Sequence, residues 1–176
     1  NESAEIIRML TSAFDALTGN ELDFCPEPLR ARIDAVNARI YETVNNGVYR
    51  AGFATTQEAY EEAVEALFAS LDWIESILSE NAYLCGGTLT EADWRLFTTL
   101  VRFDAVYYSH FKCNVRAVAD YPNISHYLDG LFAVPGIAGT VNLEHIKTHY
   151  YWSHTSINPT RIIPVGPTPA YLRRTR

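Results

Sequence analysis

The sequence predicts an all-α fold. Apolar residues recur at helical spacing over long stretches, glycines and prolines separate these stretches, and none of them reads as part of a sheet. With 176 residues, 48% of them hydrophobic, the chain is long enough to bury a single core of ordinary size. We therefore expect one helical domain.

Six helices are predicted, each from an apolar stripe with a capping residue or a proline at its start. They cover residues 3–17, 29–44, 55–78, 93–110, 122–132 and 136–152. Gly47 is expected to end the second helix in the left-handed conformation. Thr55 and Glu58 form a possible capping box for the third.

Thr90 and Asp93 stand three residues apart before an apolar run, which is the spacing of a structural capping box. After the last predicted helix, four of the eight prolines fall within residues 158–176. Because proline cannot continue a helix, this segment is expected to run as an extended tail over the surface.

Charge and cysteine content indicate which ligands and which cellular compartment the chain suits. A formal charge of −7 and a pI near 5.2 disfavour binding to nucleic acid, and no apolar run approaches the length of a membrane span. Three cysteines without zinc-like spacing suit a reducing compartment, so the cytoplasm is the expected location.

Longer motifs resemble a known family. "LTEADWRLF" and "YPNISHYLDGLFAVPGI" resemble the helical C-terminal half of the cytosolic glutathione transferases. "NNGVYRAGFATTQEAYEEAV", "LVRFDAVYYSHFKCN", "VNLEHIKTHYYWSH" and "INPTRIIPVGP" resemble the glutathionyl-hydroquinone reductases, also called xi-class transferases. The resemblance implies a glutathione transferase C-terminal-like helical bundle at 21–157. It also implies that 1–20 are the end of a thioredoxin-like domain whose remainder is absent, and that 158–176 are the tail.

The resemblance also implies a glutathione site. "NES" is similar to the turn of this superfamily that holds the γ-glutamyl end of glutathione, so Glu2 and Ser3 are the expected contacts. A carboxylate can pair with the ammonium group, while a hydroxyl and helix N-terminal amides can hold a carboxylate. From the residues alone, plain helix capping by Ser3 is the alternative.

The family's nucleophile is a cysteine in a Cys-Pro motif that precedes this turn, and this chain does not contain it. Cys25-Pro26 follows the turn and has no strand before it, so we do not assign it that role. Cys85 and Cys113 are interpreted as packing residues.

Two tyrosines are similar to those that face the aromatic substrate in the family, namely Tyr49 and Tyr150. Neighbours on a helix point about 100° apart, so Tyr151 is not expected to share their pocket. The other tyrosines considered are assigned to packing: Tyr107, Tyr108, Tyr121 and Tyr127. His145 and His149 lie one helical turn apart, but a pair is too few ligands for zinc, so no metal is predicted.

Together these features predict the substrate-side part of a glutathione-dependent reductase that removes glutathione from glutathionyl-hydroquinones by cysteine thiol chemistry. Glutathione is the expected co-substrate, and the resemblance implies a homodimer. Two alternatives remain open. One is an omega-like transferase or dehydroascorbate reductase, and the other is a non-catalytic binding module on the same fold.

Overall fold

The computed structural model describes residues 3–173, in which helices are joined by loops and no strand is present. The α-helices are α1 (Ser3–Leu10), α2 (Asp15–Thr18), α3 (Arg30–Ile40), α4 (Gly47–Gly52), α5 (Gln57–Glu80), α6 (Glu91–Arg102), α7 (Tyr108–His110), α8 (Pro122–Phe132), α9 (Leu143–Ser153) and α10 (Ala170–Arg173). Short 3₁₀ turns lie at Glu27–Leu29, Val118–Asp120 and Ala138–Thr140. The predicted all-α bundle is thereby confirmed.

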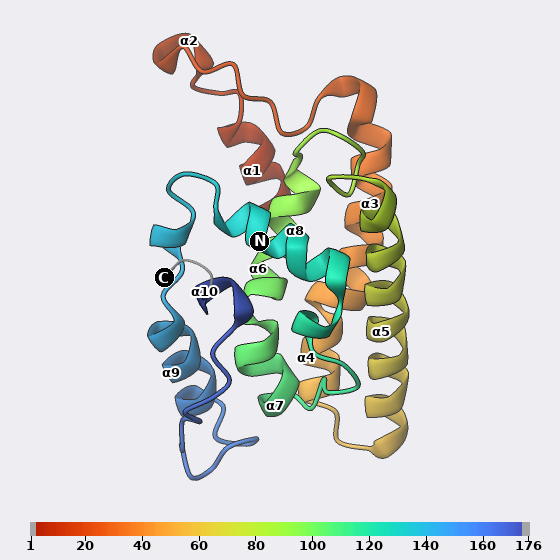
Figure 1. Cartoon of the computed structure of the whole chain (residues 1–176), viewed down its shortest axis with the longest axis vertical. Helices are drawn as coiled ribbons and strands as arrows, with labels where there is room; N and C mark the ends of the chain where they lie inside the picture. The colour runs from red at the N-terminus through yellow and green to blue at the C-terminus, as the bar shows by residue number, and fades with distance from the viewer. Residues whose placement is uncertain (1–2, 174–176) are drawn as a thin grey trace.

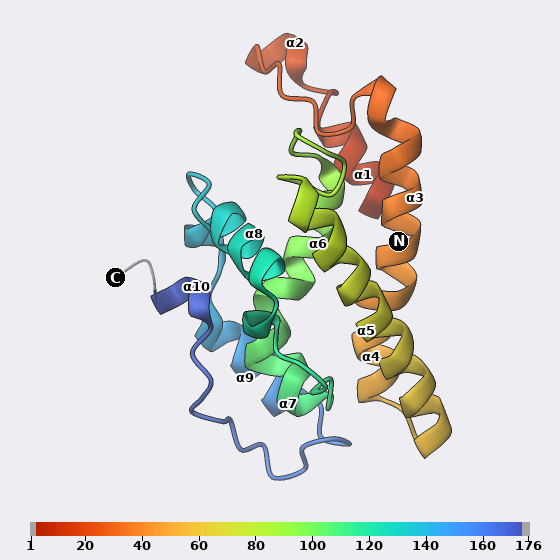
Figure 2. The same ribbon diagram turned by 45° about the vertical axis from the view of Figure 1, so that its right-hand side comes forward.

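Helices α6 and α7 run through the middle of the bundle, with α3, α4 and α5 on one side and α9 on the other (Figures 1 and 2). Helix α5 packs along α4 and α8, and α6 packs against α3 and α8. The apolar stripe of α5 is buried in this core, including Leu67, Leu71 and Ile74 at 0% exposure. The stripe that predicted the longest helix is therefore the one that forms the centre of the core.

Two π-helical segments fall within the predicted helices 29–44 and 93–110. The segment η2 (Tyr41–Asn45) joins α3 to α4, and η3 (Phe103–Tyr107) joins α6 to α7. Gly47 therefore does not end a helix, as predicted, but begins α4. There an added Cβ would lie 3.8 Å from the Cβ of Leu67. That distance is ordinary van der Waals contact, so Gly47 is simply a residue of the first turn of α4, and the left-handed-cap interpretation was wrong.

Other predicted boundaries also differ from the structure. The first predicted helix is broken after Leu10, and α5 is capped by Thr56, whose hydroxyl accepts from the Ala59 amide at 3.2 Å, instead of by Thr55. Helix α9 begins at Leu143 rather than near residue 136, because the Asn142 side chain accepts from the amide of His145 at 2.9 Å. Local capping geometry, which the apolar stripes do not encode, sets these ends.

The proline-containing segment after α9 has no regular helix until α10, a short helix that was not predicted. Tyr171 of α10 is buried against Phe132 of α8, and its hydroxyl donates to the carbonyl of Val101 at 2.6 Å. The Lys147 ammonium donates to the carbonyls of Val165 and Gly166. These contacts dock the C-terminal segment on its own domain.

Candidate functional site

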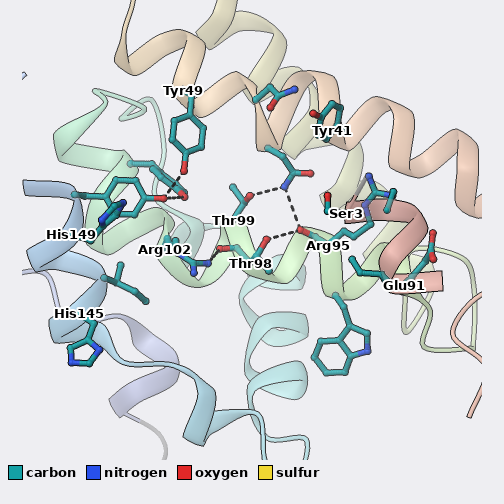
Figure 3. A pocket seen from close by; sticks show the side chains of 18 of the residues that line it. Ser3, Tyr41, Tyr49, Glu91, Arg95, Thr98, Thr99, Arg102, His145 and His149 are labelled. Atoms are coloured by element: carbon teal, nitrogen blue, oxygen red, sulfur yellow. Dashed lines mark hydrogen bonds between the residues drawn. The ribbon is translucent and has the colours of Figure 1, made fainter. Parts of the chain in front are cut away.

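A groove of about 870 Å³ runs along α6, between the α3–α4 side of the bundle and α9, with α1 at one end (Figure 3). Its lining residues combine aromatic, hydroxyl and cationic side chains. They are Ser3, Ala4, Ile7, Phe24, Tyr41, Asn45, Asn46, Tyr49, Glu91, Trp94, Arg95, Thr98, Thr99, Arg102, Tyr107, His145, Ile146, His149 and Tyr150. Its size and mixed lining are those of a site for a small aromatic ligand.

Three tyrosine hydroxyls meet at the α9 end of the groove. The hydroxyl oxygen of Tyr49 (α4) lies 2.6 Å from that of Tyr150 (α9), which lies 2.8 Å from that of Tyr107 (η3). The two tyrosines selected from the sequence are thus brought together across 101 positions. Tyr107, which the sequence analysis assigned to packing alone, completes the cluster.

Tyr150 and Tyr151 point to different surroundings, as the helical geometry predicts. The Tyr151 hydroxyl bonds to the Ser109 hydroxyl, away from the residues that line the groove. Exposure falls through the cluster, from 39% at Tyr49 to 6% at Tyr150 and 3% at Tyr107. Tyr49 is therefore the member of the cluster most open to a ligand.

Burial sets the proton affinities in the cluster. It raises the pKa of Tyr150 to about 12, while the hydrogen bond with Tyr107 and the nearby charge of Arg102 oppose this rise. The pKa of the Tyr107 hydroxyl is raised further, again chiefly by burial. The Tyr107 and Tyr150 hydroxyls therefore keep their protons at neutral pH and can act as hydrogen-bond donors.

Cationic and polar groups from α6 form the floor of the groove. Arg95 and Arg102 lie two helical turns apart on α6, and both line it. The Asn45 amide of η2 donates to the Thr99 hydroxyl at 2.6 Å and to the Arg95 carbonyl at 3.3 Å. These bonds hold the π-helical segment against α6 and fix the width of the groove.

The opposite end of the groove is closed by α1. Ser3 lines the groove there, whereas Glu2 lies outside the described residues. The Arg8 guanidinium contacts the buried Glu91 carboxylate at 2.7 Å, and the Asn37 amide donates to the same carboxylate at 3.0 Å. The hydrogen bond with the Glu91 carboxylate raises the pKa of the Arg8 guanidinium. Sequence reasoning missed Glu91, because nothing in its spacing distinguishes a buried acid from a first-turn surface acid.

The Thr90/Asp93 pair lies behind the groove, at the start of α6. The Asp93 carboxylate accepts from the Thr90 amide (2.7 Å), the Thr90 hydroxyl (2.9 Å), the Leu84 amide (3.0 Å) and the Tyr127 hydroxyl (2.8 Å). Asp93 and Thr90 are both 0% exposed. This carboxylate therefore caps α6 and also ties it to the preceding loop and to α8, which fixes the helix that carries the groove floor.

The cysteines of the chain are free thiols, and all three are buried. Burial raises the pKa of Cys113 to about 12 and also raises that of Cys85. Cys25 is 6% exposed, and it does not line the groove that holds the tyrosines. These environments suit packing residues rather than reactive thiolates.

No group of three or more histidine, cysteine or acidic side chains is placed to hold a metal ion within residues 3–173. His145 and His149 both line the groove, His149 with its ring centroid 5.1 Å from that of Tyr150. Over the same range, none of the helices is long and apolar enough to cross a membrane.

Comparison with known proteins identifies the fold. Residues 57–130 match the family "Glutathione S-transferase, C-terminal domain". Glutathionyl-hydroquinone reductase PcpF of Sphingobium chlorophenolicum is 59% identical over 95% of this chain and 53% of that protein. Glutathionyl-hydroquinone reductase YqjG of Escherichia coli is 57% identical over 95% of this chain and 51% of that protein. The chain thus spans about half the length of these curated relatives.

Solved structures agree with these sequence comparisons. The glutathione-bound structure of YqjG matches with a TM-score of 0.95 at 56% identity, covering 97% of this chain and 56% of that one. The glutathione transferase Xi of Phanerochaete chrysosporium matches with a TM-score of 0.93 at 57% identity, covering 96% of this chain and 55% of that one. Over nearly its whole length the chain is therefore similar to the helical C-terminal part of xi-class glutathione transferases, and residues 57–130 carry the glutathione S-transferase C-terminal domain.

Proposed function

We propose that this chain is the substrate-side domain of a glutathione-dependent reductase that removes glutathione from glutathionyl-hydroquinones. The observation that carries the proposal is the 2.6 Å approach of the Tyr49 and Tyr150 hydroxyls at the edge of an aromatic groove. Relatives named as glutathionyl-hydroquinone reductases, at 59% and 57% identity, support it. The glutathione-bound structure of YqjG supports glutathione as the co-substrate.

In this proposal, residues 1–20 belong to a thioredoxin-like domain that supplies the nucleophilic cysteine, residues 21–157 form the helical domain and 158–176 the tail. The cysteine thiolate attacks the sulfur of the conjugate, and the carbon–sulfur bond breaks. The aromatic carbon takes the electron pair and a proton, which releases the hydroquinone. The cysteine is left in a mixed disulfide with glutathione, which a second glutathione then reduces.

The part of this chain in that reaction is to bind and polarise the aromatic ring. As the carbon–sulfur bond breaks, electron density moves onto the ring and its oxygens. Tyr49 and Tyr150 are close enough together to donate to one such oxygen, which stabilises the transition state more than the ground state. At the other end of the groove, Ser3 and Glu2 are proposed to hold the γ-glutamyl group of glutathione. Ser3 is one of the residues that line the groove, which supports this assignment.

We also propose that the protein acts in the cytoplasm as a homodimer. Three free, buried cysteines suit a reducing compartment. The protein is proposed to need no metal.

The test is an assay of the longer protein that contains this chain, with glutathione and either a glutathionyl-hydroquinone or dehydroascorbate as substrate. We expect release of hydroquinone at a higher kcat/KM than reduction of dehydroascorbate. Preference for dehydroascorbate would favour the omega-like alternative, which relatives named omega-like transferases keep open. Activity with neither substrate would favour a binding module.

The 176-residue chain alone is the matched control for the source of the thiol. We expect no hydroquinone release above the uncatalysed rate, because its three cysteines are buried. Turnover that disappears in a Cys25→Ser variant would overturn the assignment of Cys25 as a packing residue.

A further inference from the structure

The proposed reaction needs a proton donor at the aromatic ring. When the carbon–sulfur bond breaks, the ring carbon takes the electron pair and also a proton. The groove-lining side chains that carry charge or exchange protons are Tyr41, Tyr49, Glu91, Arg95, Arg102, Tyr107, His145, His149 and Tyr150. Among these residue types, only histidine ordinarily changes its charge between about pH 5 and 8. A histidine is therefore the side chain best suited to give up a proton at neutral pH.

The other groups in the groove hold their protons or are already bound. Burial raises the pKa of Tyr150 to about 12 and raises that of Tyr107 further, so these two hydroxyls donate hydrogen bonds without releasing protons. The Glu91 carboxylate accepts from the Arg8 guanidinium at 2.7 Å, at the α1 end of the groove. The two groove-lining arginines stay protonated in proteins and so stabilise charge instead of transferring protons.

His149 is the histidine at the tyrosine end of the groove. Its ring lies edge-on to that of Tyr150, with 5.1 Å between the ring centroids. Figure 3 shows its imidazole beside the end of the Tyr49 side chain, where the Tyr49 and Tyr150 hydroxyls meet. His145, one turn earlier on α9, lies farther from these hydroxyls in the same view. Because His149 is exposed, its imidazole can also exchange protons with solvent.

The structure of the substrate brings the reacting carbon to this end of the groove. In a glutathionyl-hydroquinone, the carbon that bears sulfur is bonded directly to a carbon that bears oxygen. If that oxygen accepts from Tyr49 and Tyr150, the sulfur-bearing carbon lies at the α9 end of the groove, on the side of His149. The positive charge of Arg102 acts on Tyr150 and so stabilises negative charge on the same oxygen.

The groups around His149 leave its imidazole free. Within residues 3–173, the His149 side chain makes no hydrogen bond. The nearest histidine on the same helix segment is His154, whose ring centroid lies 6.0 Å away and whose Nδ1 is 3.2 Å from Nε2 of His110. That contact engages His154 with α7 rather than with the groove. The facing cation from α6 is Arg102, which favours release of a proton from an imidazolium beside it.

We propose that His149 is a catalytic acid–base residue that delivers the proton to the ring carbon, and that the helical domain alone exchanges ring protons of bound hydroquinones with solvent. In the reductase reaction, the imidazolium proton passes to the ring carbon as the carbon–sulfur bond breaks, and the imidazole regains a proton from water. Without a thiol, the imidazolium protonates the carbon while the phenol oxygen loses its proton to water, which gives the keto tautomer. The imidazole then removes the original ring proton, and the oxygen is protonated again. The inference rests on the proposed function for the nature of the ligand.

The first experiment follows deuterium exchange into methoxyhydroquinone in oxygen-free D₂O, by the loss of its ring-proton NMR signals. We expect the 176-residue chain to accelerate this exchange over buffer. His149→Gln should lower the accelerated rate by about 10²-fold, the low end for general acid–base catalysis, because the imidazole is exposed. Added imidazole should restore part of the rate in His149→Ala.

The matched control is His145→Gln, which alters an exposed, groove-lining histidine on the same helix and should leave the exchange rate unchanged. Exchange by the wild type no faster than in buffer would overturn the inference. An unchanged rate in His149→Gln, or an equal loss in His145→Gln, would also overturn it.

The second experiment uses the longer protein and separates this inference from the proposed function. His149→Gln should lower kcat for a glutathionyl-hydroquinone but not for a small non-aromatic mixed disulfide of glutathione, whose reduction protonates no carbon. Equal losses on both substrates would indicate a structural role and overturn the inference. Exchange that depends on His149, without hydroquinone release, would support the inference and count against the proposed function. Hydroquinone release that His149→Gln leaves unchanged would do the reverse.

Discussion

Asp93→Ala is expected to destabilise the domain more than loss of a helix cap alone. An ordinary cap contributes about 1–2 kcal/mol. Here the carboxylate accepts four hydrogen bonds, from the Thr90 amide and hydroxyl, the Leu84 amide and the Tyr127 hydroxyl, and it is 0% exposed. Three of these donors cannot turn to solvent, and each unpaired donor costs about 1–3 kcal/mol. Allowing for relaxation, we expect a loss of about 3–5 kcal/mol.

The assay is urea unfolding followed by circular dichroism, with the free energy of unfolding taken from the midpoint and slope. Asp120→Ala is the matched control, because Asp120 is exposed and, within residues 3–173, accepts from the Ala117 amide alone, at 3.2 Å. It should lose no more than about 1 kcal/mol. Tyr127→Phe removes one of the four bonds to Asp93 and should lose about 1 kcal/mol.

The reasoning is refuted if Asp93→Ala loses no more stability than Asp120→Ala. A change in the unfolding slope would instead show that the native or denatured ensemble had changed. If Asp93→Ala does not fold, Tyr127→Phe still tests the network, since it retains the Asp93 cap on α6. An unaltered stability in Tyr127→Phe would contradict the role of Asp93 in joining α6 to α8.

Two further predictions concern the free energy of unfolding, measured by urea unfolding. Gly52→Ala should lower it by about 1–3 kcal/mol or more, because the new Cβ would lie 2.2 Å from a ring carbon of Phe111. Gly130→Ala, whose Cβ would have no atom within 4 Å, should raise it by up to about 1 kcal/mol. Equal effects would show that α4 can move away from the ring. Burial lowers the pKa of His110 from 6.5 to about 4. Between these two values the imidazole is protonated in the unfolded chain but neutral in the folded chain. The free energy of unfolding should therefore fall as the pH is lowered from 6.5 to 4. This fall should be less steep in His110→Gln than in a variant of the exposed His126. An equally steep fall with pH in the two variants would contradict the prediction.

Much of the helical fold could be predicted because the apolar stripes are long and regular. The bounds predicted for α8 agree with the structure, since Pro122 marks its start and the stripe ends at Phe132. The π-helical segments were not predicted, because apolar periodicity indicates a helix but does not tell a π-helical turn from an α-helical one. Gly47 was misread as a helix end because a glycine after an apolar stripe is typical of a left-handed cap, whereas here it begins the next helix.

The candidate site was only partly accessible from the sequence. The resemblance to a family selected Tyr49 and Tyr150, and helical geometry excluded Tyr151. Tyr107 lies on a different helical segment, and only tertiary packing brings its hydroxyl to that of Tyr150. Glu91 was missed for the same reason, since its partner Arg8 stands 83 positions away.

The central claim is most directly tested by kcat/KM for a glutathionyl-hydroquinone in the longer protein carrying Tyr49→Phe, Tyr150→Phe or both. Removal of one donor at an oxyanion site lowers the rate by about 10²–10³, and the half-exposed Tyr49 should lose less. We predict that each single variant loses activity toward the hydroquinone conjugate but not toward a small non-aromatic mixed disulfide of glutathione. The double variant should lose less than the product of the singles, because both hydroxyls serve one oxygen. Single variants with unchanged kcat/KM, or equal losses on both substrates, would contradict the account.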